Sequence, residues 1–207
     1  MFEVDQEKDL PLMANAEEIR IRHYMLKLQF DLELEIVQGE SIMFCDTHIS
    51  SSKEYPKEFI LDCKDLEIIA VNEILEEAGN VDEKSKEIFD QFDNRSCKIQ
   101  FRNWYDKKRS QLSYKSEPWC VRIYKNEINE EFPKIVHIQW KTLPGAKSLL
   151  WRDDQNGSKC VFTPAAAVNN RSLFPCQEPP IGKENMPFKN LMMSTGWQLR
   201  VKFSVLC

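Results

Sequence analysis

The side chains that could carry chemistry gather in one short segment, which combines an arginine, a cysteine and an acidic residue with three prolines. The segment is Asn169-Asn170-Arg171-Ser172-Leu173-Phe174-Pro175-Cys176-Gln177-Glu178-Pro179-Pro180. An arginine guanidinium pairs well with carboxylates and carbonyls. Arg171 is therefore expected to bind Glu178 or the carbonyls of the loop and to tie the two ends of the segment together. Proline fixes φ and has no backbone donor, so the loop is expected to hold one shape and to stay out of any sheet.

The same segment also carries apolar anchors. Phe174 and Cys176 alternate with Pro175 and are expected to hold the loop against a hydrophobic core. Two interpretations follow: the segment is a rigid corner of a β-domain, or it is a wall of a substrate cleft shared with a following domain. The candidate residues under both are Arg171, Phe174, Pro175, Cys176, Gln177, Glu178 and Pro179.

A second candidate segment lies shortly before the first. Asp153-Asp154-Gln155-Asn156-Gly157 has the composition of a tight turn, because Asp, Asn and Gly favour turn conformations. It stands between Ser148–Trp151 and a strand expected over Cys160–Thr163. The residues singled out in it are Trp151, Asp154, Gln155 and Gly157.

The sequence does not predict metal or nucleophile chemistry. A catalytic zinc helix places two histidines at positions i and i+4, with a glutamate beside the first to activate water. The chain has three histidines, His23, His48 and His137, and none begins a His-Glu-x-x-His motif. Its seven cysteines include no Cys-x-x-Cys pair, and its six glycines are too scattered for a phosphate-binding loop. We therefore expect no catalytic residue, no metal ligand and no cofactor in this chain, and reduced thiols that mostly fill space in strands.

The bulk composition fits one globular domain. The chain has 207 residues, of which 42% are hydrophobic and 29% charged, and its net charge is −5. Because no basic field exists to attract phosphates, nucleic acid is not expected as a partner. No run of about 18 apolar residues occurs, so no membrane partner is expected either. The first residues show no secretory signal, which predicts a cytoplasmic protein.

These candidate residues need elements to position them, and the dominant pattern is an alternation of apolar and polar residues. It runs from Ile19 to Ile36 and predicts a long strand with one buried face. Gln38-Gly39-Glu40 is predicted to be a turn or bulge. A second strand is predicted over Ser41–Ile49, so that the two strands form an antiparallel ribbon.

Short strands are also predicted along the rest of the chain, at Phe59–Leu61, Leu66–Val71, Trp119–Tyr124, Lys134–Trp140, Cys160–Thr163 and Trp197–Val205. Residues 1–18 are expected to be an extended lead-in strand or loop. Many short strands with turn signals between them predict an all-β fold, a large antiparallel β-sandwich or open saddle-shaped sheet.

One stretch departs from this pattern and predicts a short helical insertion around residues 82–112. Apolar residues at helical spacing predict an amphipathic helix over Asp82–Phe92. A second helical candidate contains Phe101, Trp104, Tyr105 and Gln111. The dense charge of this stretch is expected to form a solvated face and not a partner site.

Three segments together resemble the N-terminal domain of the zinc aminopeptidases of the aminopeptidase N and leukotriene hydrolase family. They are the hairpin that opens at Arg22-His23-Tyr24-Met25-Leu26-Lys27-Leu28 and runs through Gly39 and Phe44, the turn and strand at Leu149–Thr163, and the segment Asn169–Pro180, in the same order as in the family. The resemblance implies a β-saddle fold. It also implies a parent enzyme that removes N-terminal residues from peptides, with zinc held by His-Glu-x-x-His and a distant Glu.

The resemblance also implies what this chain lacks. Other family members place a Gln or Glu pair before the arginine to meet the free amine of the substrate. These positions fall on Pro164 and Ala166, which cannot bind an ammonium group. In the family, several more strands would follow Val205. We therefore expect residues 1–207 to be an N-terminal β-domain that is truncated at its C-terminal side and has no catalytic domain.

Two hypotheses for function follow. In the first, the chain is the non-catalytic N-terminal domain of a zinc metalloaminopeptidase. Its partner is then the catalytic domain of the parent enzyme, it meets a peptide substrate only in that context, and zinc belongs to the full-length family members. In the alternative, the chain is a stand-alone β-sandwich module that docks on a full-length aminopeptidase through an exposed sheet edge. A third hypothesis, an independent hydrolase built on other residues, stays open.

Overall fold

The structure, a computed structural model, describes most of the chain. It covers residues 11–48, 55–75, 104, 107–126, 131–162, 167–177, 192–194 and 201–206. Within these ranges nearly all the regular secondary structure is β-strand, and every pair of neighbouring strands is antiparallel. No helix in these ranges is long and apolar enough to cross a membrane.

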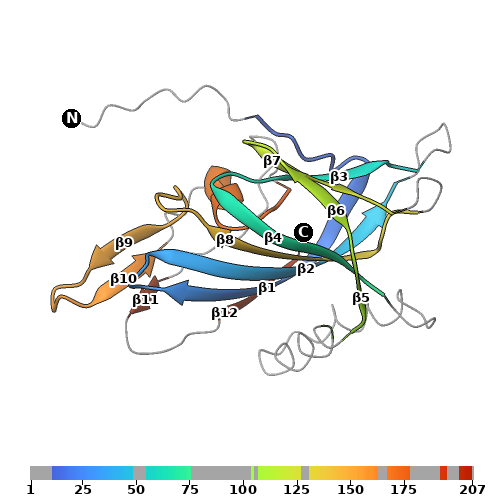
Figure 1. The fold of residues 1–207 in the computed structure, drawn as a ribbon. Coiled ribbons are helices and arrows are strands. Elements are labelled where there is room, and N and C mark those ends of the chain that lie inside the picture. The colour runs from blue at the N-terminus through green and yellow to red at the C-terminus, as the bar shows by residue number, and fades with distance from the viewer. Residues whose placement is uncertain are drawn as a thin grey trace.

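A six-stranded sheet forms the centre of the fold, in the order β12-β1-β2-β8-β4-β5 (Figure 1). Its strands are β1 (Ile19–Asp31), β2 (Ile36–Thr47), β4 (Leu66–Ile74), β5 (Arg109–Gln111), β8 (Ile135–Thr142) and β12 (Val201–Leu206). A three-stranded sheet has the order β3-β7-β6, from β3 (Glu58–Asp62), β6 (Ser113–Ser116) and β7 (Cys120–Tyr124). A third, in the order β11-β10-β9, contains β9 (Leu150–Asp153), β10 (Lys159–Phe162) and β11 (Met192–Ser194).

One face of the six-stranded sheet packs on the sheet β3-β7-β6. Leu28 of β1 and Ile138 of β8 belong to the same buried cluster as Phe59 of β3 and Ile123 of β7, and all four are fully buried. We call this the inner face of the six-stranded sheet. Side chains alternate along each strand, so the two sheets bury one apolar layer between them. The prediction of an all-β, antiparallel sandwich-like fold is confirmed.

The first hairpin differs from its prediction. The chain turns directly after Asp31, whose Oδ1 accepts hydrogen bonds from the backbone N–H groups of Glu33 (3.1 Å) and Leu34 (2.9 Å). Glu35 has a φ of 54°, which completes the reversal before β2 begins. The strand predicted to continue to Ile36 therefore ends at Asp31, because an Asp side chain that caps its own backbone favours a turn.

Gly39 was predicted to lie in a turn or bulge and instead lies inside β2, in regular register opposite Trp140 of β8. A Cβ at this position would lie 2.3 Å from the Trp140 Cζ2 atom. Glycine in a strand often marks a close approach of another group, and here that group is the indole ring. The prediction of a turn or bulge at Gln38-Gly39-Glu40 is wrong, and the reason for the glycine is tertiary packing.

The helical insertion is wrong at its C-terminal end, although Trp104, the one described residue between positions 76 and 106, is helical. Arg109–Gln111 form β5, which pairs antiparallel with Asn72–Ile74 of β4. The backbone groups of β4 offer partners to this segment, and strand pairing overrides a weak local helical pattern. Trp104 is buried, and its ring meets Phe44 edge-on at 5.2 Å. Asp82–Phe92, Phe101 and Tyr105 lie outside the described residues.

The remaining strand predictions agree with the structure to within a few residues. Strands β3, β4, β7, β8 and β10 match the predicted segments, and β12 matches the described part of its segment, since residues 197–200 lie outside the described ranges. Strands β6, β9 and β11, which have only three or four residues, were not foreseen. Such short segments carry too few residues to show an alternating pattern.

Candidate functional site

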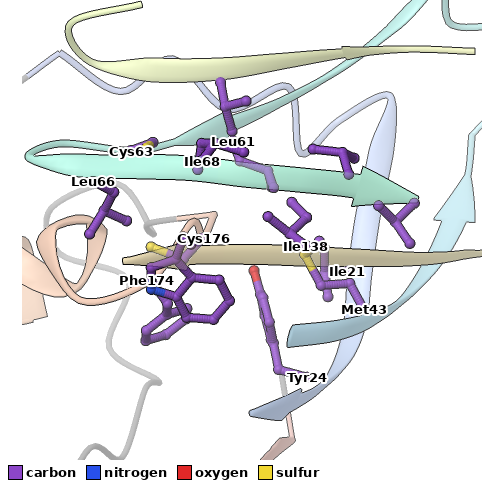
Figure 2. Close-up of a cluster of buried hydrophobic side chains, with 14 of the residues drawn as sticks. Ile21, Tyr24, Met43, Leu61, Cys63, Leu66, Ile68, Ile138, Phe174 and Cys176 are labelled. Atoms are coloured by element: carbon purple, nitrogen blue, oxygen red, sulfur yellow. The ribbon is translucent and has the colours of Figure 1, made fainter. Parts of the chain in front are cut away.

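The candidate segment reaches the inner face of the six-stranded sheet through a short 3-10 helix, η1 (Ala167–Ser172). The helix ends in a turn, because the N–H groups of Leu173 and Phe174 both donate to the Asn170 carbonyl, at 2.8 and 3.0 Å. Figure 2 shows the next residues among the buried side chains of the core, with Phe174 and Cys176 close to Tyr24 and Ile138. The structure describes this segment as far as Gln177.

Arg171 is buried, with 1% of its surface exposed. Its Nη1 donates to the Pro11 carbonyl at 2.7 Å, and its own carbonyl accepts from the Lys64 N–H at 2.9 Å. The carbonyl was expected to belong to the loop, and it belongs instead to the lead-in segment, 160 positions earlier. Glu178, the other expected partner, lies outside the described residues. A buried guanidinium is tolerated only when its donors are used, so Arg171 links the start of the domain to the loop.

Cys176 corrects the expectation that this loop stays out of any sheet. It forms an isolated antiparallel bridge with Asp62 at the end of β3. The Asp62 N–H donates to the Cys176 carbonyl at 2.8 Å, and the Cys176 N–H donates back to the Asp62 carbonyl at 3.0 Å. Pro175 has no donor of its own, but it does not stop the next residue from pairing. The loop therefore extends the edge of the sheet β3-β7-β6 by one residue.

The side-chain amide of Gln177 makes the two hydrogen bonds to the backbone of β1 that a neighbouring strand would otherwise make. Its Oε1 accepts from the Ile21 N–H at 3.0 Å, and its Nε2 donates to the Ile19 carbonyl at 2.6 Å. Its backbone N–H donates to the Tyr24 hydroxyl at 3.1 Å. The register of β1 shifts between Ile21 and His23, and a bulge of this kind leaves backbone groups in need of partners. Gln177 supplies partners on one side of that bulge.

Trp140 connects the loop to the strands below it. The ring is fully buried, lies against Gly39, and donates from Nε1 to the Leu173 carbonyl at 2.8 Å. Tyr24 adds an edge-on contact to Phe174, with 5.8 Å between ring centroids. Sequence reasoning did not single out Trp140 or Tyr24. The sequence feature that could have indicated them is a tryptophan or tyrosine within an apolar strand, because these side chains need a polar partner when they are buried.

A buried carboxylate completes this region. Asp62 is fully buried, and its Oδ1 accepts from the N–H groups of Met13 (2.7 Å) and Ala14 (3.3 Å). Asn15 continues the contact along β3, where its side chain accepts from the Ile60 N–H at 2.8 Å and donates to the Glu58 carbonyl at 2.9 Å. The lead-in segment, the end of β3 and the loop therefore meet at one place. The sequence signal was an Asp between the apolar residues of a strand end.

The described part of the candidate segment therefore faces inward. Arg171, Phe174, Pro175 and Cys176 are buried, and Gln177 uses both ends of its amide on β1. This arrangement holds the lead-in segment, the end of β3 and the loop together. It leaves a ligand little access to these side chains. Glu178 and Pro179, and the replaced positions Pro164 and Ala166, lie outside the described residues.

The second candidate segment forms the turn between β9 and β10. The Asp154 Oδ1 accepts from the Asn156 and Ser158 N–H groups, at 2.8 and 2.7 Å. Gly157 has a φ of 77°, which favours glycine, and the position is open to solvent space. Gln155 is exposed, and Trp151 is half-buried against the main core. The composition predicted this turn correctly, and its contacts are local.

Across the described ranges, no three His, Cys, Asp or Glu side chains come close enough together to hold a metal ion. Cys45, Cys63, Cys120 and Cys176 are buried free thiols, and Cys160 is half-buried. Burial, with smaller contributions from Cys120 and Asp65, raises the pKa of the Cys63 thiol to about 12. A thiol at such a pKa is a poor nucleophile near neutral pH, so Cys63 is suited to packing.

Comparison with known sequences points to one group of enzymes. No family model matches the chain. Aminopeptidase O of Homo sapiens is 23% identical over 300 aligned positions, which cover 94% of this chain and 35% of that protein. Aminopeptidase O of Mus musculus is 40% identical over 94 residues, which cover 44% of this chain and 10% of that protein. The chain thus spans about a third of the length of the human relative. The Cys176–Pro180 sequence also resembles aminopeptidase O.

The fold is shared with solved structures of one enzyme. Native leukotriene A4 hydrolase from Saccharomyces cerevisiae matches with a TM-score of 0.57 and 18% identity, over 87% of this chain and 24% of that chain. The yeast enzyme in complex with bestatin matches with a TM-score of 0.53 and 19% identity, over 86% of this chain and 23% of that chain. At these identities the likeness shows a shared fold and nothing finer.

Proposed function

We propose that the chain serves as a non-catalytic N-terminal β-domain of a zinc aminopeptidase, which its likeness to aminopeptidase O and to leukotriene A4 hydrolase supports. The observation that carries the proposal is coverage. The human relative matches 94% of this chain but only 35% of its own length, so the resemblance is to one part of a larger protein. In this proposal the rest of the enzyme supplies the zinc site, and peptide substrate is met only in that context.

The sequence supports the same proposal. None of its three histidines begins a His-Glu-x-x-His motif, the pattern that places two zinc ligands and a general base on one helix. As far as Gln177, the candidate segment that resembles the family contributes inward-facing contacts and not an exposed set of acid, base and nucleophile. The domain then acts as a scaffold whose stability is its contribution to the enzyme.

The alignment also supports a shortened domain. It has 300 positions against the 207 residues of this chain, so at least 93 positions, the excess of one over the other, are occupied by the human protein alone. Gaps in an alignment stand between matched positions. We therefore propose that the chain lacks internal stretches of the relative's domain, which differs from a shortening confined to its C-terminal side.

A direct test is to purify the chain, measure bound zinc by mass spectrometry and assay hydrolysis of aminoacyl reporter substrates with added zinc. A full-length aminopeptidase assayed in parallel serves as the positive control. The proposal predicts no stoichiometric zinc and no zinc-dependent turnover by the chain. Turnover that is lost on chelation and restored by zinc would contradict it.

The stand-alone interaction module is the second candidate, and one observation favours it. Strand β12 is the outermost strand in the order of the six-stranded sheet, paired with β1 on one side. Among the described strands none pairs with its other side, and such an edge can recruit a strand from another protein. Size-exclusion chromatography of the chain with a full-length aminopeptidase distinguishes the two candidates: co-elution favours the module, and separate elution counts against it.

A further inference from the structure

A row of polar side chains crosses the face of the six-stranded sheet that is opposite the inner face. On β8, His137 alternates with Val136 and Ile138, which belong to the inner core, so its side chain lies on the other side. Five neighbouring strands contribute to this row, which we call the transverse network. Its members are Lys27 of β1, Glu40 of β2, His137 of β8, Asn72 of β4 and Arg109 of β5.

The contacts of the transverse network are continuous. Lys27 Nζ donates to Glu40 Oε1 at 2.7 Å, and Glu40 Oε2 lies 3.3 Å from His137 Nε2. On its other side, His137 Nδ1 lies 3.4 Å from both Asn72 Nδ2 and Arg109 Nη1. The His137 side chain is fully buried, and that of Glu40 is 16% exposed. One imidazole therefore joins the two halves of the row.

These partners fix the protonation state of His137. An arginine nitrogen can only donate, so Nδ1 must act as an acceptor and carry no hydrogen, whichever way the Asn72 amide is turned. Nε2 then carries the hydrogen and donates to the Glu40 carboxylate. His137 is therefore held as a neutral imidazole in one tautomer, between a carboxylate on one side and a cation on the other.

Electrostatics agree with this geometry. Burial lowers the pKa of His137, and the Arg109 cation acts in the same direction, against the raising effect of Glu40. Burial tends to raise the pKa of Glu40, but hydrogen bonds from His137 and Lys27 outweigh it and hold that pKa at about 2. Near neutral pH the row therefore consists of two cations, one carboxylate, one amide and one neutral imidazole.

Strand β5 is the element that depends most on the contacts of the transverse network. It has only three residues and pairs with β4 alone. Just before it, Trp104 belongs to a second buried cluster on this face, with Met25, Ile42, Phe44, Ile74 and Ile135. Hydrogen bonds from the Leu75 N–H to the Lys108 carbonyl (2.9 Å) and from the Leu112 N–H to the Val71 carbonyl (3.0 Å) continue the pairing on either side. A strand this short at the end of a sheet is a low-stability element.

We infer that His137 is an acid-sensitive latch, whose protonation at Nδ1 sets a new N–H against the Arg109 donor and releases β5 together with Trp104. The Arg109 contact is lost because donor then faces donor and a second cation is placed beside Arg109, whereas the Asn72 amide can turn its oxygen toward the new N–H. Release of Trp104 uncovers the apolar side chains of the second cluster. In mild acid β5 and Trp104 therefore leave this face of the sheet, while the packing on the inner face is unchanged.

The direction of the pH dependence follows from the lowered pKa. As the pH falls, the unfolded or opened chain takes up the proton at an ordinary imidazole value near 6.5 before the closed state does. The stabilisation of the closed state by neutral His137 is therefore complete above pH 6.5 and declines as the pH falls below this value. His23 is the other buried histidine on this face, and its ring lies against Phe44, with 5.8 Å between the ring centroids.

Hydrogen exchange of the full chain tests the latch. After correction for intrinsic rates, exchange of the amides of residues 109–112 is expected to rise about tenfold between about pH 7.5 and about pH 5, whereas amides of β3 and β7 keep their protection. In His137→Gln, which keeps a donor toward Glu40 but cannot take up a proton, the rise is expected to stay below about twofold. Arg109→Gln, which keeps a donor and removes the cation, is expected to reduce the rise.

Two controls make the outcome decisive. His48→Gln removes an exposed histidine and is expected to leave the response unchanged, whereas His23→Gln tests the other buried ring. Loss of the response in His23→Gln but not in His137→Gln, or an equal response in His137→Gln, would overturn the latch. Nitrogen chemical shifts of the His137 ring need no variant, and a shift that reports hydrogen on Nδ1 near neutral pH would overturn it as well.

Discussion

The two faces of the six-stranded sheet are built from the same strands, yet they work by different physical means. On β8, Val136, Ile138 and Trp140 point to the inner face, and His137 between them points to the other. The inner face holds the family-like loop by shape and by hydrogen bonds to backbone groups. The opposite face is held by charges in the transverse network. Changes on the inner face should therefore act alike at every pH, and changes on the other should not.

The largest effect is expected from Trp140→Ala. The change empties a fully buried ring site and removes the donor to the Leu173 carbonyl. It should lower the free energy of unfolding by roughly 4 kcal/mol, as in other large-to-small core changes. Urea denaturation measures this value, and Trp151→Ala in the half-buried hairpin, expected to cost roughly 1 kcal/mol, is the matched control. Equal losses in the two variants would show that the loop is not fastened through Trp140.

Gly39→Ala should rank next. The added Cβ would lie 2.3 Å from the Trp140 Cζ2 atom, so the ring or the strand must move, at an expected cost of roughly 2 kcal/mol. Gly157→Ala places the same methyl in open space at a φ of 77° and should cost about 1 kcal/mol for backbone strain alone. Thermal unfolding of both variants separates crowding from strain. A Gly39→Ala protein as stable as the wild type would contradict the close approach.

Glu40→Gln sharpens the contrast between the faces through its pH dependence. Since the folded pKa of Glu40 is lowered from 4.5 to about 2, its contribution is present above 4.5 and is lost as the pH falls through 2. The variant should be less stable than the wild type by roughly 1–2 kcal/mol near neutral pH, and this gap should close in acid. Unfolding free energies measured across this range test it, with Glu67→Gln, half-exposed beside Lys141, as control. A difference in unfolding free energy that stays constant with pH would show that the Glu40 carboxylate does not take part in the transverse network.

The smallest effect, with opposite sign, is expected from Ser41→Ala. The Ser41 hydroxyl is fully buried on the inner face and has no hydrogen-bond partner within the described residues. Removing a buried, unpaired hydroxyl should leave stability unchanged or raise it by about 1 kcal/mol. Ser116→Ala, at an exposed position, should change nothing. A clear destabilisation in Ser41→Ala would show that the hydroxyl has a partner, such as a bound water.

Local features of this chain could be predicted from its sequence, and distant ones could not. The turn at Asp154–Gly157 was predictable because the Asp154 carboxylate binds N–H groups two and four residues later. The docking of the loop was not, because the partners of Arg171 and Gln177 lie 160 and 158 positions away. The β-class of the fold was predictable from alternation, since that pattern is repeated along most strands.

Two failures have the same cause. Gly39 has polar neighbours and a flexible backbone, so it looks like a turn until the Trp140 ring is placed beside it. Arg109–Gln111 look helical until β4 offers them backbone partners. The transverse network was not predicted because its five residues come from five separate strands. No local sequence pattern indicates the strand order that brings these strands side by side.

The central claim is that the family-like loop fastens the domain from inside and does not line an open site, and thiol labelling tests it most directly. Cys176 is fully buried in the loop, and Cys160 in the β9–β10 hairpin is half-buried. With a maleimide reagent under native conditions and peptide mapping by mass spectrometry, Cys160 should react at least about a hundredfold faster than Cys176. Comparable labelling rates at the two positions would place the loop at an open surface and contradict the account.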